Sequence, residues 1–434
     1  MTAFDDALPR RAFLKAAVAA GGTAALSACL DRLGGGEPVP AGEGAAAHPD
    51  RQHAWNDHVR TDEYGNHLLP SHQVLLYLSL PGDGPPSADA RETVAAALDT
   101  LDEAYAWSHE ALLHSAGYSP AYFDRFDAAL PDSVDLPHPT RLSNFETPDF
   151  DEQDVLVHLA SDRADVVLEA DAALRGERAG ANGVEMPAPL TDALELDSRR
   201  TGFVGRGLPR EKADSLEGIP QPNPVPESSP LFMGFAAGFR KNQASESYVS
   251  LDTGPFAGGT TKSVGNWRQR LDDWYGEQDH DERVMEMFSP GHAAENLVEE
   301  AGTNLGATSQ VDRFLDDITE QATEYGRVGH AQKSARANRD SEGNVRLLRR
   351  HFESTDGDVA SLHFPSLQRS IADFEAVRRA MNGTDVTEAT PAVRQRVNNG
   401  ILEYIFVRSR GYFLVPPRSL RALPTPTGPA DADG

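Results

Sequence analysis

The feature that most constrains the fold is a repeated succession of a short apolar run and an amphipathic segment. Residues 74–80 form an apolar run that ends at Pro-Gly, and residues 91–115 carry apolar side chains at helical spacing. Residues 155–160 form a second apolar run, and an amphipathic segment rich in Ala, Val and Leu follows at residues 162–174. The runs predict strands and the longer segments predict helices, in the order of a β-α-β-β-α-β module.

A second series follows a stretch rich in Pro, Gly and Ser at residues 205–230, and it begins with an apolar run at residues 231–235. The pattern predicts a helix at residues 267–275 and an irregular helical insertion at residues 276–322. The remaining predicted elements are a strand at 361–364, a helix at 371–381 and a closing strand pair at 404–415. The sequence therefore predicts an α+β chain with two ferredoxin-like modules, each an antiparallel sheet with helices.

The first 29 residues have the pattern of a targeting signal. Arg10-Arg11 opens a twin-arginine motif, and the apolar run at residues 16–28 is too short to span a bilayer. Leu26-Ser27-Ala28-Cys29 resembles a lipobox, and Cys29 is the only cysteine of the chain. A buried structural cysteine is the alternative. We expect export by the twin-arginine route and a lipid anchor on Cys29 at the outer face of the cell membrane, which would be the chain's only attachment to the membrane.

The ends of the chain differ in composition from its middle, because they are rich in Gly, Ala, Pro and charge and lack apolar periodicity. We therefore expect a disordered tether and a disordered tail on either side of two folded modules. The predicted segments are the signal at 1–29, the tether at 30–65, the N-terminal module at 66–205, the C-terminal module at 206–420 and the tail at 421–434.

The charge balance limits the choice of partners. The chain has 67 Asp and Glu residues against 40 Lys and Arg residues, which gives a formal net charge of −27. Such a surface is typical of proteins that stay soluble in concentrated salt. Neutralising phosphates requires clustered Lys and Arg, and the sequence has no long basic stripe, so a nucleic-acid partner is excluded.

Four segments resemble, in the same order, motifs of the dye-decolorising peroxidase family. They are Gly-Pro-Phe-Ala-Gly-Gly-Thr at 254–260, Gly-His at 329–330 running on to Arg-Ala-Asn-Arg-Asp at 336–340, Leu-Leu-Arg-Arg at 347–350, and Gly-Tyr-Phe-Leu-Val-Pro-Pro at 411–417. The resemblance covers about residues 71–418 and suggests a divergent, haloarchaeal-like member. It implies a dimeric, α+β barrel-like haem peroxidase architecture with one haem b per chain. It also implies hydrogen peroxide and a reducing small-molecule donor as substrates, and it leaves a homo-oligomer open.

The resemblance assigns His330 as the axial ligand of the haem iron. A neutral imidazole is a good axial donor and leaves the opposite face of the iron open to peroxide. The alternative for His330 is a surface histidine in a polar segment. The resemblance also places Gly258, Gly259 and Thr260 close to the macrocycle, where small residues permit close approach of the backbone. Phe364 is a further expected cofactor-binding residue.

Arg349 is the expected catalytic and haem-contacting cation on the open face, with Arg350 as its competitor. A fixed cation there would stabilise the charge that develops while the O–O bond breaks. The family also uses an acid in a Gly-x-x-Asp-Gly motif, for which this chain has Asp-Ser-Leu-Glu-Gly at residues 214–218. Glu217 is therefore the expected proton-carrying acid. His351 is a second ionisable group expected in the same pocket.

The resemblance leaves the partner of the ligand imidazole open. Ser370 stands where relatives carry an acid that orients the ring, and Asp373, one helical turn on, is the expected replacement. Trp267, Trp274 and Tyr412 are candidate electron relays, for which core packing is the commoner use.

Three functions remain open at this point. The first is a haem-dependent peroxidase that oxidises bulky phenolic or dye-like donors at the cell surface. The second is an exported haem- or iron-handling binding lipoprotein with weak or no peroxidase activity, which the altered acid motif favours. The third is a surface scaffold that binds no haem.

Overall fold

The computed structural model describes residues 38–214, 216 and 219–428, and its first half is a β-α-β-β-α-β module. The elements of this N-terminal module are β3 (His72–Ser79), α3 (Ala88–Ala104), β4 (Leu113–Tyr118), β6 (Val155–Ser161), α5 (Ala164–Leu174) and β9 (Glu195–Phe203). Its strands are antiparallel in the order β9-β3-β6-β4. β3 is a continuous apolar run because both faces are covered: Val74 and Leu76 pack under α3 and α5, whereas Leu75 and Tyr77 face the other way.

The second half repeats this topology. The elements of the C-terminal module are β10 (Thr260–Gln269), β11 (Leu348–Arg349), β12 (Phe352–Ser354), β13 (Ser361–Gln368), α12 (Ile371–Ala380) and β14 (Ile405–Val415). The strand order is β14-β10-β13-β12, with antiparallel pairs. The predicted fold class, α+β with two ferredoxin-like modules, is confirmed.

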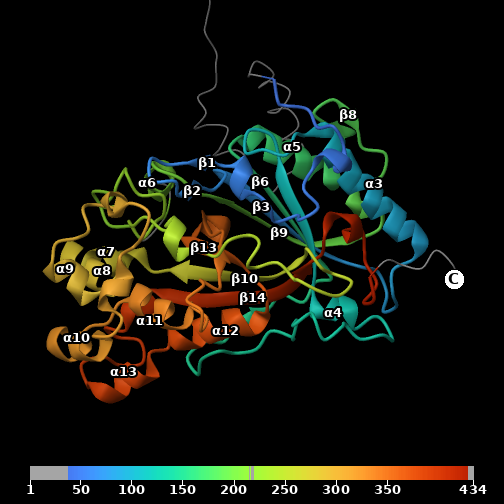
Figure 1. Ribbon diagram of the computed structural model, residues 1–434. Helices are drawn as coiled ribbons and strands as arrows, with labels where there is room; N and C mark the ends of the chain where they lie inside the picture. Colours follow the sequence, from blue (N-terminus) through green and yellow to red (C-terminus); the bar gives the residue numbers. More distant parts are fainter. Residues whose placement is uncertain (1–37, 215, 217–218, 429–434) are drawn as a thin grey trace, which may run out of the picture.

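The two modules share one ten-stranded sheet rather than standing apart. β12 pairs with β9 through Glu353 and Phe203, and β14 pairs with β4 through Leu414 and Tyr118. Because β10 also pairs with β14, the sheet closes on itself as a barrel, with the helices outside it (Figure 1). Leu75, Tyr77 and Leu156 of the first module pack inside it against Val264, Phe352 and Phe413 of the second.

A long insertion between β10 and β11 carries most helices of the second module, and they gather at one end of the molecule in Figure 1. These helices are α7 (Leu271–Glu277), α8 (His280–Met287), α9 (Pro290–Ala294), α10 (Ile318–Tyr325) and α11 (His330–Ala337). Shorter elements elsewhere are β1 (Arg60–Thr61), β2 (His67–Leu68), α4 (Pro120–Phe123), β5 (Asp149–Phe150), β7 (Gly180–Ala181), β8 (Val184–Glu185), α6 (Leu208–Ala213) and α13 (Thr384–Ala389). Among the described residues, no helix has both the length and the apolar character needed to cross a membrane.

Four element predictions were wrong in part. The closing strand pair predicted at residues 404–415 is the single strand β14 (Ile405–Val415). The helix predicted at residues 91–115 ends at Ala104, and its last residues belong to β4. Residues 231–235 form turns instead of a strand, because their side chains are buried against the outer face of the sheet and not by strand pairing. The helix predicted at 267–275 begins only at Leu271, since the residues before it complete β10.

Part of the predicted tether and tail is folded. Gln52, His53 and Trp55 are buried, so residues 38–65 are not a disordered tether. The Gln52 side chain accepts from the backbone N–H of Ala116 and donates to the Pro416 carbonyl, which joins this segment to both modules. Leu423 is fully buried, so the tail is not disordered where it begins. The sequence did not predict these contacts, because the two segments are rich in polar residues and glycine and few apolar side chains take part in their packing.

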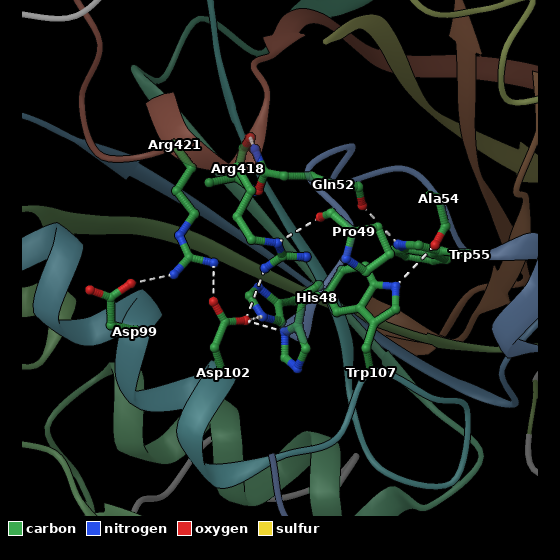
Figure 2. A network of polar contacts seen from close by, with 12 residues as sticks. His48, Pro49, Gln52, Ala54, Trp55, Asp99, Asp102, Trp107, Arg418 and Arg421 are labelled. Carbon is green, nitrogen blue, oxygen red and sulfur yellow. Dashed lines mark hydrogen bonds and ion pairs between the residues drawn. The ribbon is translucent and has the colours of Figure 1, made fainter. Parts of the chain in front are cut away.

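A single buried carboxylate ties both ends of the described chain to α3 (Figure 2). Asp102 Oδ1 accepts hydrogen bonds from His48 Nδ1 at 2.8 Å, His114 Nε2 at 3.0 Å and Arg418 Nη1 at 2.9 Å. Arg421 forms an ion pair with its Oδ2 at 2.5 Å. Burial alone would raise the pKa of Asp102, but the hydrogen bonds from both histidines and the charge of Arg421 hold it well below its ordinary value.

The same cluster brings together two imidazoles and a carboxylate, a combination that binds metals elsewhere. Here two guanidinium groups already occupy the carboxylate and would repel a cation. We therefore interpret Asp102 as the centre of a structural network.

Several predictions fall on residues outside the described part of the chain. These are the twin-arginine motif at Arg10-Arg11, the lipid anchor at Cys29 and the proton-carrying role of Glu217. They stay predictions from the sequence.

Candidate active site

The main cavity lies between the outer face of the C-terminal module's sheet and helix α11. Side chains of a strand alternate between its faces, and the register of β11 and β12 on β13 turns Arg349, His351 and Glu353 to one face. All three line the cavity, whose empty volume of about 1040 Å³ includes space open to solvent. The lining is mostly apolar and includes Met233, Phe235, Trp267, Phe288, Leu362, Phe364 and Ile401.

Helix α11 forms the opposite wall and begins at His330. The preceding residue must be glycine, because a Cβ on Gly329 would overlap the Phe288 carbonyl oxygen. The Gln332 side chain accepts from the Gly329 N–H at 3.1 Å and donates to the Phe314 carbonyl at 2.8 Å. These contacts fix the first turn of α11. Beside His330, the helix presents the small residues Ala331, Ser334 and Ala335 to the cavity.

His330 is held in the neutral state. Burial, together with the nearby charges of Lys333 and Arg349, lowers the pKa of its imidazole to about 3. Neither ring nitrogen has a hydrogen-bond partner within the described part of the chain. A neutral imidazole that lines a cavity and has a free lone pair is the arrangement a metal ligand requires.

The expected acid partner of His330 does not reach it. The Ser370 hydroxyl caps α12 and donates to Asp373 at 3.1 Å. Asp373 in turn accepts from Arg346 at 2.9 Å. Both side chains are therefore engaged within their own helix and its neighbour, and the prediction that Asp373 orients the ring was wrong for this structure.

Arg349, the last residue of β11, and Arg350, in the extended link between β11 and β12, point to opposite faces of the sheet. The Arg349 guanidinium lines the cavity and donates to Gln243 Oε1 and the Asn242 carbonyl, each at 3.2 Å. It forms no ion pair with any carboxylate that the structure describes, and burial lowers its pKa to about 10, which leaves it charged near neutral pH. Arg350 faces the barrel interior, where it donates to Glu246 at 2.6 Å. The structure thus places Arg349 in the cavity and Arg350 outside it.

A stack of three rings forms the floor of the cavity. Phe364 lies parallel to Trp267, with ring centroids 4.6 Å apart, and to His351 at 5.8 Å. Gly265 makes room for this stack, because a Cβ there would lie 2.6 Å from the Trp267 indole nitrogen. Burial and the charge of Arg349 lower the pKa of His351 to about 3, so His351 is a neutral ring here.

Glu353 is the functional residue that the sequence interpretation missed. It is fully buried, and its Oε1 accepts from the Phe232 N–H at 2.9 Å and from Gln269 at 3.4 Å. Its Oε2 has no hydrogen-bond partner in the described part of the chain. Burial raises the pKa of Glu353 to about 8, and the two donors only partly offset this effect. The alternation Arg349, His351, Glu353 was the available sequence signal, because it marks one face of a strand.

Glu353 makes the stability of the chain depend on pH. Between the ordinary glutamate pKa of about 4.3 and about 8, the folded chain holds a proton that the unfolded chain releases. The contribution of Glu353 to the free energy of unfolding therefore decreases as pH rises through this window. We expect Glu353→Gln to remove this decrease, measured by urea unfolding near pH 5 and near pH 8. Glu320→Gln, at an exposed glutamate, is the control and should follow the wild type; equal slopes in both variants would contradict the assignment.

The glycine-rich segment does not approach the cavity. Gly259 lies against β14, where a Cβ would lie 2.7 Å from the Val415 carbonyl oxygen. Thr260 is fully buried and donates to the Val249 carbonyl at 2.8 Å, whereas Gly258 lies near Asp50 and Arg51. β10 advances about 3.3 Å per residue, so Thr260 and the Trp267 end of the strand are roughly 20 Å apart. Gly258, Gly259 and Thr260 therefore do not line this cavity, and their predicted cofactor contacts stay a prediction from the sequence.

Of the candidate electron relays, only Trp267 lines the cavity. Trp274 donates its indole N–H to the Met233 carbonyl, and Tyr412 donates to Glu375. Both are fully buried core side chains.

Comparison with solved structures identifies the fold as that of dye-decolorising peroxidases. A variant of DypB from Rhodococcus jostii RHA1 in complex with haem superposes with a TM-score of 0.54 at 15% identity, over 86% of this chain and 97% of that chain. The encapsulated DyP-type peroxidase from Mycobacterium smegmatis gives 0.54 at 14% identity, over 83% and 97%. A putative DyP-type peroxidase from Shewanella oneidensis gives 0.51 at 14% identity, over 88% and 98%. At such identities the likeness shows the fold alone.

Sequence comparison gives a family without an activity. No curated protein matches the chain. One family model, described as a family of unknown function (DUF7405), matches residues 70–417, which include both modules and every cavity residue described above. The chain therefore belongs to the DUF7405 family.

Proposed function

We propose that this protein is a haem-dependent peroxidase that binds one haem b in the main cavity through His330, reduces hydrogen peroxide and oxidises a small-molecule donor. One observation carries the proposal: a neutral, unpartnered imidazole on the helix wall and an unpaired guanidinium, Arg349, on the sheet wall line the same apolar cavity. The fold shared with dye-decolorising peroxidases supports it.

The residues present fit a haem. His330 offers a free ring nitrogen, the small residues of α11 leave room beside it, and the apolar lining, including Phe364, suits a macrocycle. When bound, haem would supply the iron for His330 and the electrons that reduce peroxide. The chain's own part is to hold the group, exclude water from it and place charge and protons next to the peroxide.

Peroxide reduction requires one oxygen to lose a proton and the other to gain one while the O–O bond breaks. Arg349 would stabilise the negative charge on the departing oxygen, because it is fixed by Gln243 and Asn242 and pairs with no carboxylate among the described residues. Glu353 is the carboxyl group in the described lining, and its unpartnered Oε2 would take up and return the proton. Glu217 stays a second proposed proton carrier.

The visible spectrum of the chain, expressed with added haem, tests the proposal. We expect a Soret band that is lost in His330→Ala. Among the described residues, His330 is the one histidine of helix α11 that lines the cavity. His138→Ala is the matched control, since His138 is half exposed and pairs only with surface acids. A band that survives in His330→Ala would overturn the ligand assignment, and no band in the wild type would overturn the function.

A second function, an exported haem-handling lipoprotein with weak peroxidase activity, is favoured by one observation. Glu353 has a pKa of about 8, so it is mostly protonated at neutral pH and a poor base there. Tight haem retention with slow peroxide turnover at pH 7 would support this function. Export, anchoring at Cys29, a surface adapted to high salt and self-association belong to the proposal and rest on the sequence.

A further inference from the structure

The inner face of the strands that build the main cavity carries a second, separate cluster of charge. Because neighbouring side chains point to opposite faces, Arg349 points out of the barrel and Arg350 points into it. Lys262 of β10 also points into the barrel. Together with His158 of β6 they line a small cavity among buried side chains, with an empty volume of about 250 Å³. About 10 Å³ of it is free for the centre of a water-sized atom, which is near the minimum that holds one such atom. The remaining lining residues are His53, Trp55, Ser115, Pro365, Leu367 and Val415.

Lys262 is buried there without enough acceptors. Its Nζ donates to Ser115 Oγ at 3.2 Å and to His158 Nδ1 at 3.1 Å. His158 Nε2 lies 2.7 Å from Gln73 Oε1, which only accepts, so Nε2 carries the ring proton and Nδ1 is the acceptor. His158 is therefore neutral. The third N–H of Lys262 has no acceptor, and no carboxylate of the described chain pairs with it.

The other buried lysine of this module, Lys333, has an acceptor for each of its three N–H donors. Lys333 is also fully buried and also lacks a carboxylate partner. Its Nζ donates to three oxygen atoms: the Met381 carbonyl, the Asn399 carbonyl and Asn399 Oδ1. Lys333 thus needs no further acceptor, whereas Lys262 faces a cavity with one donor unused.

Arg350 adds an unused donor to the same cavity. Its Nη2 donates to Glu246 and to the His53 carbonyl, so Glu246 balances its charge. Its Nε is buried and has no acceptor among the residues that the structure describes. Around this cavity, one positive charge, that of protonated Lys262, is left without a counter-charge. Burial and the charge of Arg350 lower the pKa of Lys262 to about 7 as a result.

We propose that this inner cavity binds a single small inorganic anion of the halide class, chloride in particular, held by Lys262 Nζ and Arg350 Nε. Both groups are donors without enough acceptors, and an anion supplies the missing acceptor and the missing charge. The free volume is close to that of one water-sized atom. Chloride is larger than water, so it enters when the lining residues move slightly apart, and larger oxyanions such as sulfate are excluded. The anion stabilises the end of the barrel that the segment around His53 and Trp55 closes.

Binding of the anion is coupled to the proton on Lys262. Only the ammonium form attracts a halide, so the apparent affinity for chloride falls about ten-fold per pH unit above the pKa of about 7. The site requires no haem and is independent of the proposed peroxidase function.

Chemical unfolding of the full chain in sodium chloride or sodium gluconate at equal ionic strength tests the site. We expect the unfolding midpoint near pH 6 to rise with chloride and not with gluconate, which is too large to enter, and the chloride effect to fade near pH 9. Lys262→Met should lose the chloride-specific shift. Lys333→Met, at the satisfied lysine, should keep it even if that variant is less stable.

A direct measurement settles the occupant independently of the variants. Crystals grown in sodium bromide should show anomalous scattering beside Lys262 Nζ. A chloride response that is the same in Lys262→Met as in the wild type, a response that does not change with pH, or bromide bound only at exposed residues would overturn the proposal, and the cavity would then hold a water molecule.

Discussion

Replacing Arg349 with leucine is expected to slow the reaction of the haem-loaded chain with hydrogen peroxide by about 10²–10³-fold. The Arg349 guanidinium lines the cavity, stays charged near neutral pH and pairs with no carboxylate in the part of the chain that the structure describes. Leucine keeps an aliphatic stem but is shorter, and it removes the charge that stabilises the departing oxygen. Stopped-flow absorbance of the haem after mixing with peroxide measures this rate, and the Soret band checks that the variant still holds haem.

Two further variants separate this role from a general loss of charge. Arg349→Lys keeps a cation and should recover part of the rate, although it lacks the planar fork that binds Gln243 and Asn242. Arg339 also lines the cavity, but Asp312 neutralises it at 2.9 Å, so Arg339→Leu should react close to the wild-type rate. An unchanged rate in Arg349→Leu would remove Arg349 from the mechanism.

The fold was predictable where burial follows a simple period. β3, β6, α5 and α12 were found within a few residues of their bounds, since strands covered on both faces are continuous apolar runs and outer helices have one apolar stripe. Residues 231–235 have the same apolar composition as a strand but are buried without pairing. Local composition cannot distinguish these two kinds of burial.

The ordered ends of the chain were unpredictable for a different reason. Their anchors are single polar side chains, such as Gln52 and Arg418, whose partners lie more than 60 residues away along the chain. No periodicity records such a contact. A segment rich in Gly, Ala and charge therefore has the composition of a tether even where it closes one end of a barrel.

The candidate site was predicted in part. The residue that was missed, Glu353, could have been found from the alternation of side chains between the two faces of a strand. His330, Arg349 and Phe364 came from the family resemblance, and the structure brings all three to one cavity. Glu353 lies two residues beyond His351 on the same face of the strand, outside every motif of the family. The resemblance alone left Arg349 and Arg350 as competitors, whereas their adjacency in an extended segment requires that they point to opposite faces of the sheet. One face serves the main cavity and the other the inner anion site.

Replacing Asp102 with asparagine is expected to lower the free energy of unfolding by about 3–5 kcal/mol. The change keeps the size of the side chain but removes the buried counter-charge of Arg418 and leaves Arg421, beside it, with only the exposed Asp99. Because Arg418 and His48 lie on the two ends of the described chain, the loss should loosen both ends from α3 (Figure 2). Urea unfolding monitored by circular dichroism measures the change, and limited proteolysis should show earlier cleavage around His48 than in the wild type.

Asp99 offers the matched control, because it binds the same arginine from the surface. Asp99 Oδ1 accepts from Arg421 at 2.5 Å, but its side chain is 58% exposed, whereas the Asp102 side chain is fully buried. An exposed pair contributes about 0–1 kcal/mol, so Asp99→Asn should change stability by no more than that. If both variants lose the same small amount, the buried carboxylate does not organise the ends of the chain. A large loss of stability in Asp102→Asn alone would show that the buried position of Asp102, and not the number of its ion pairs, is what holds both ends of the chain on α3.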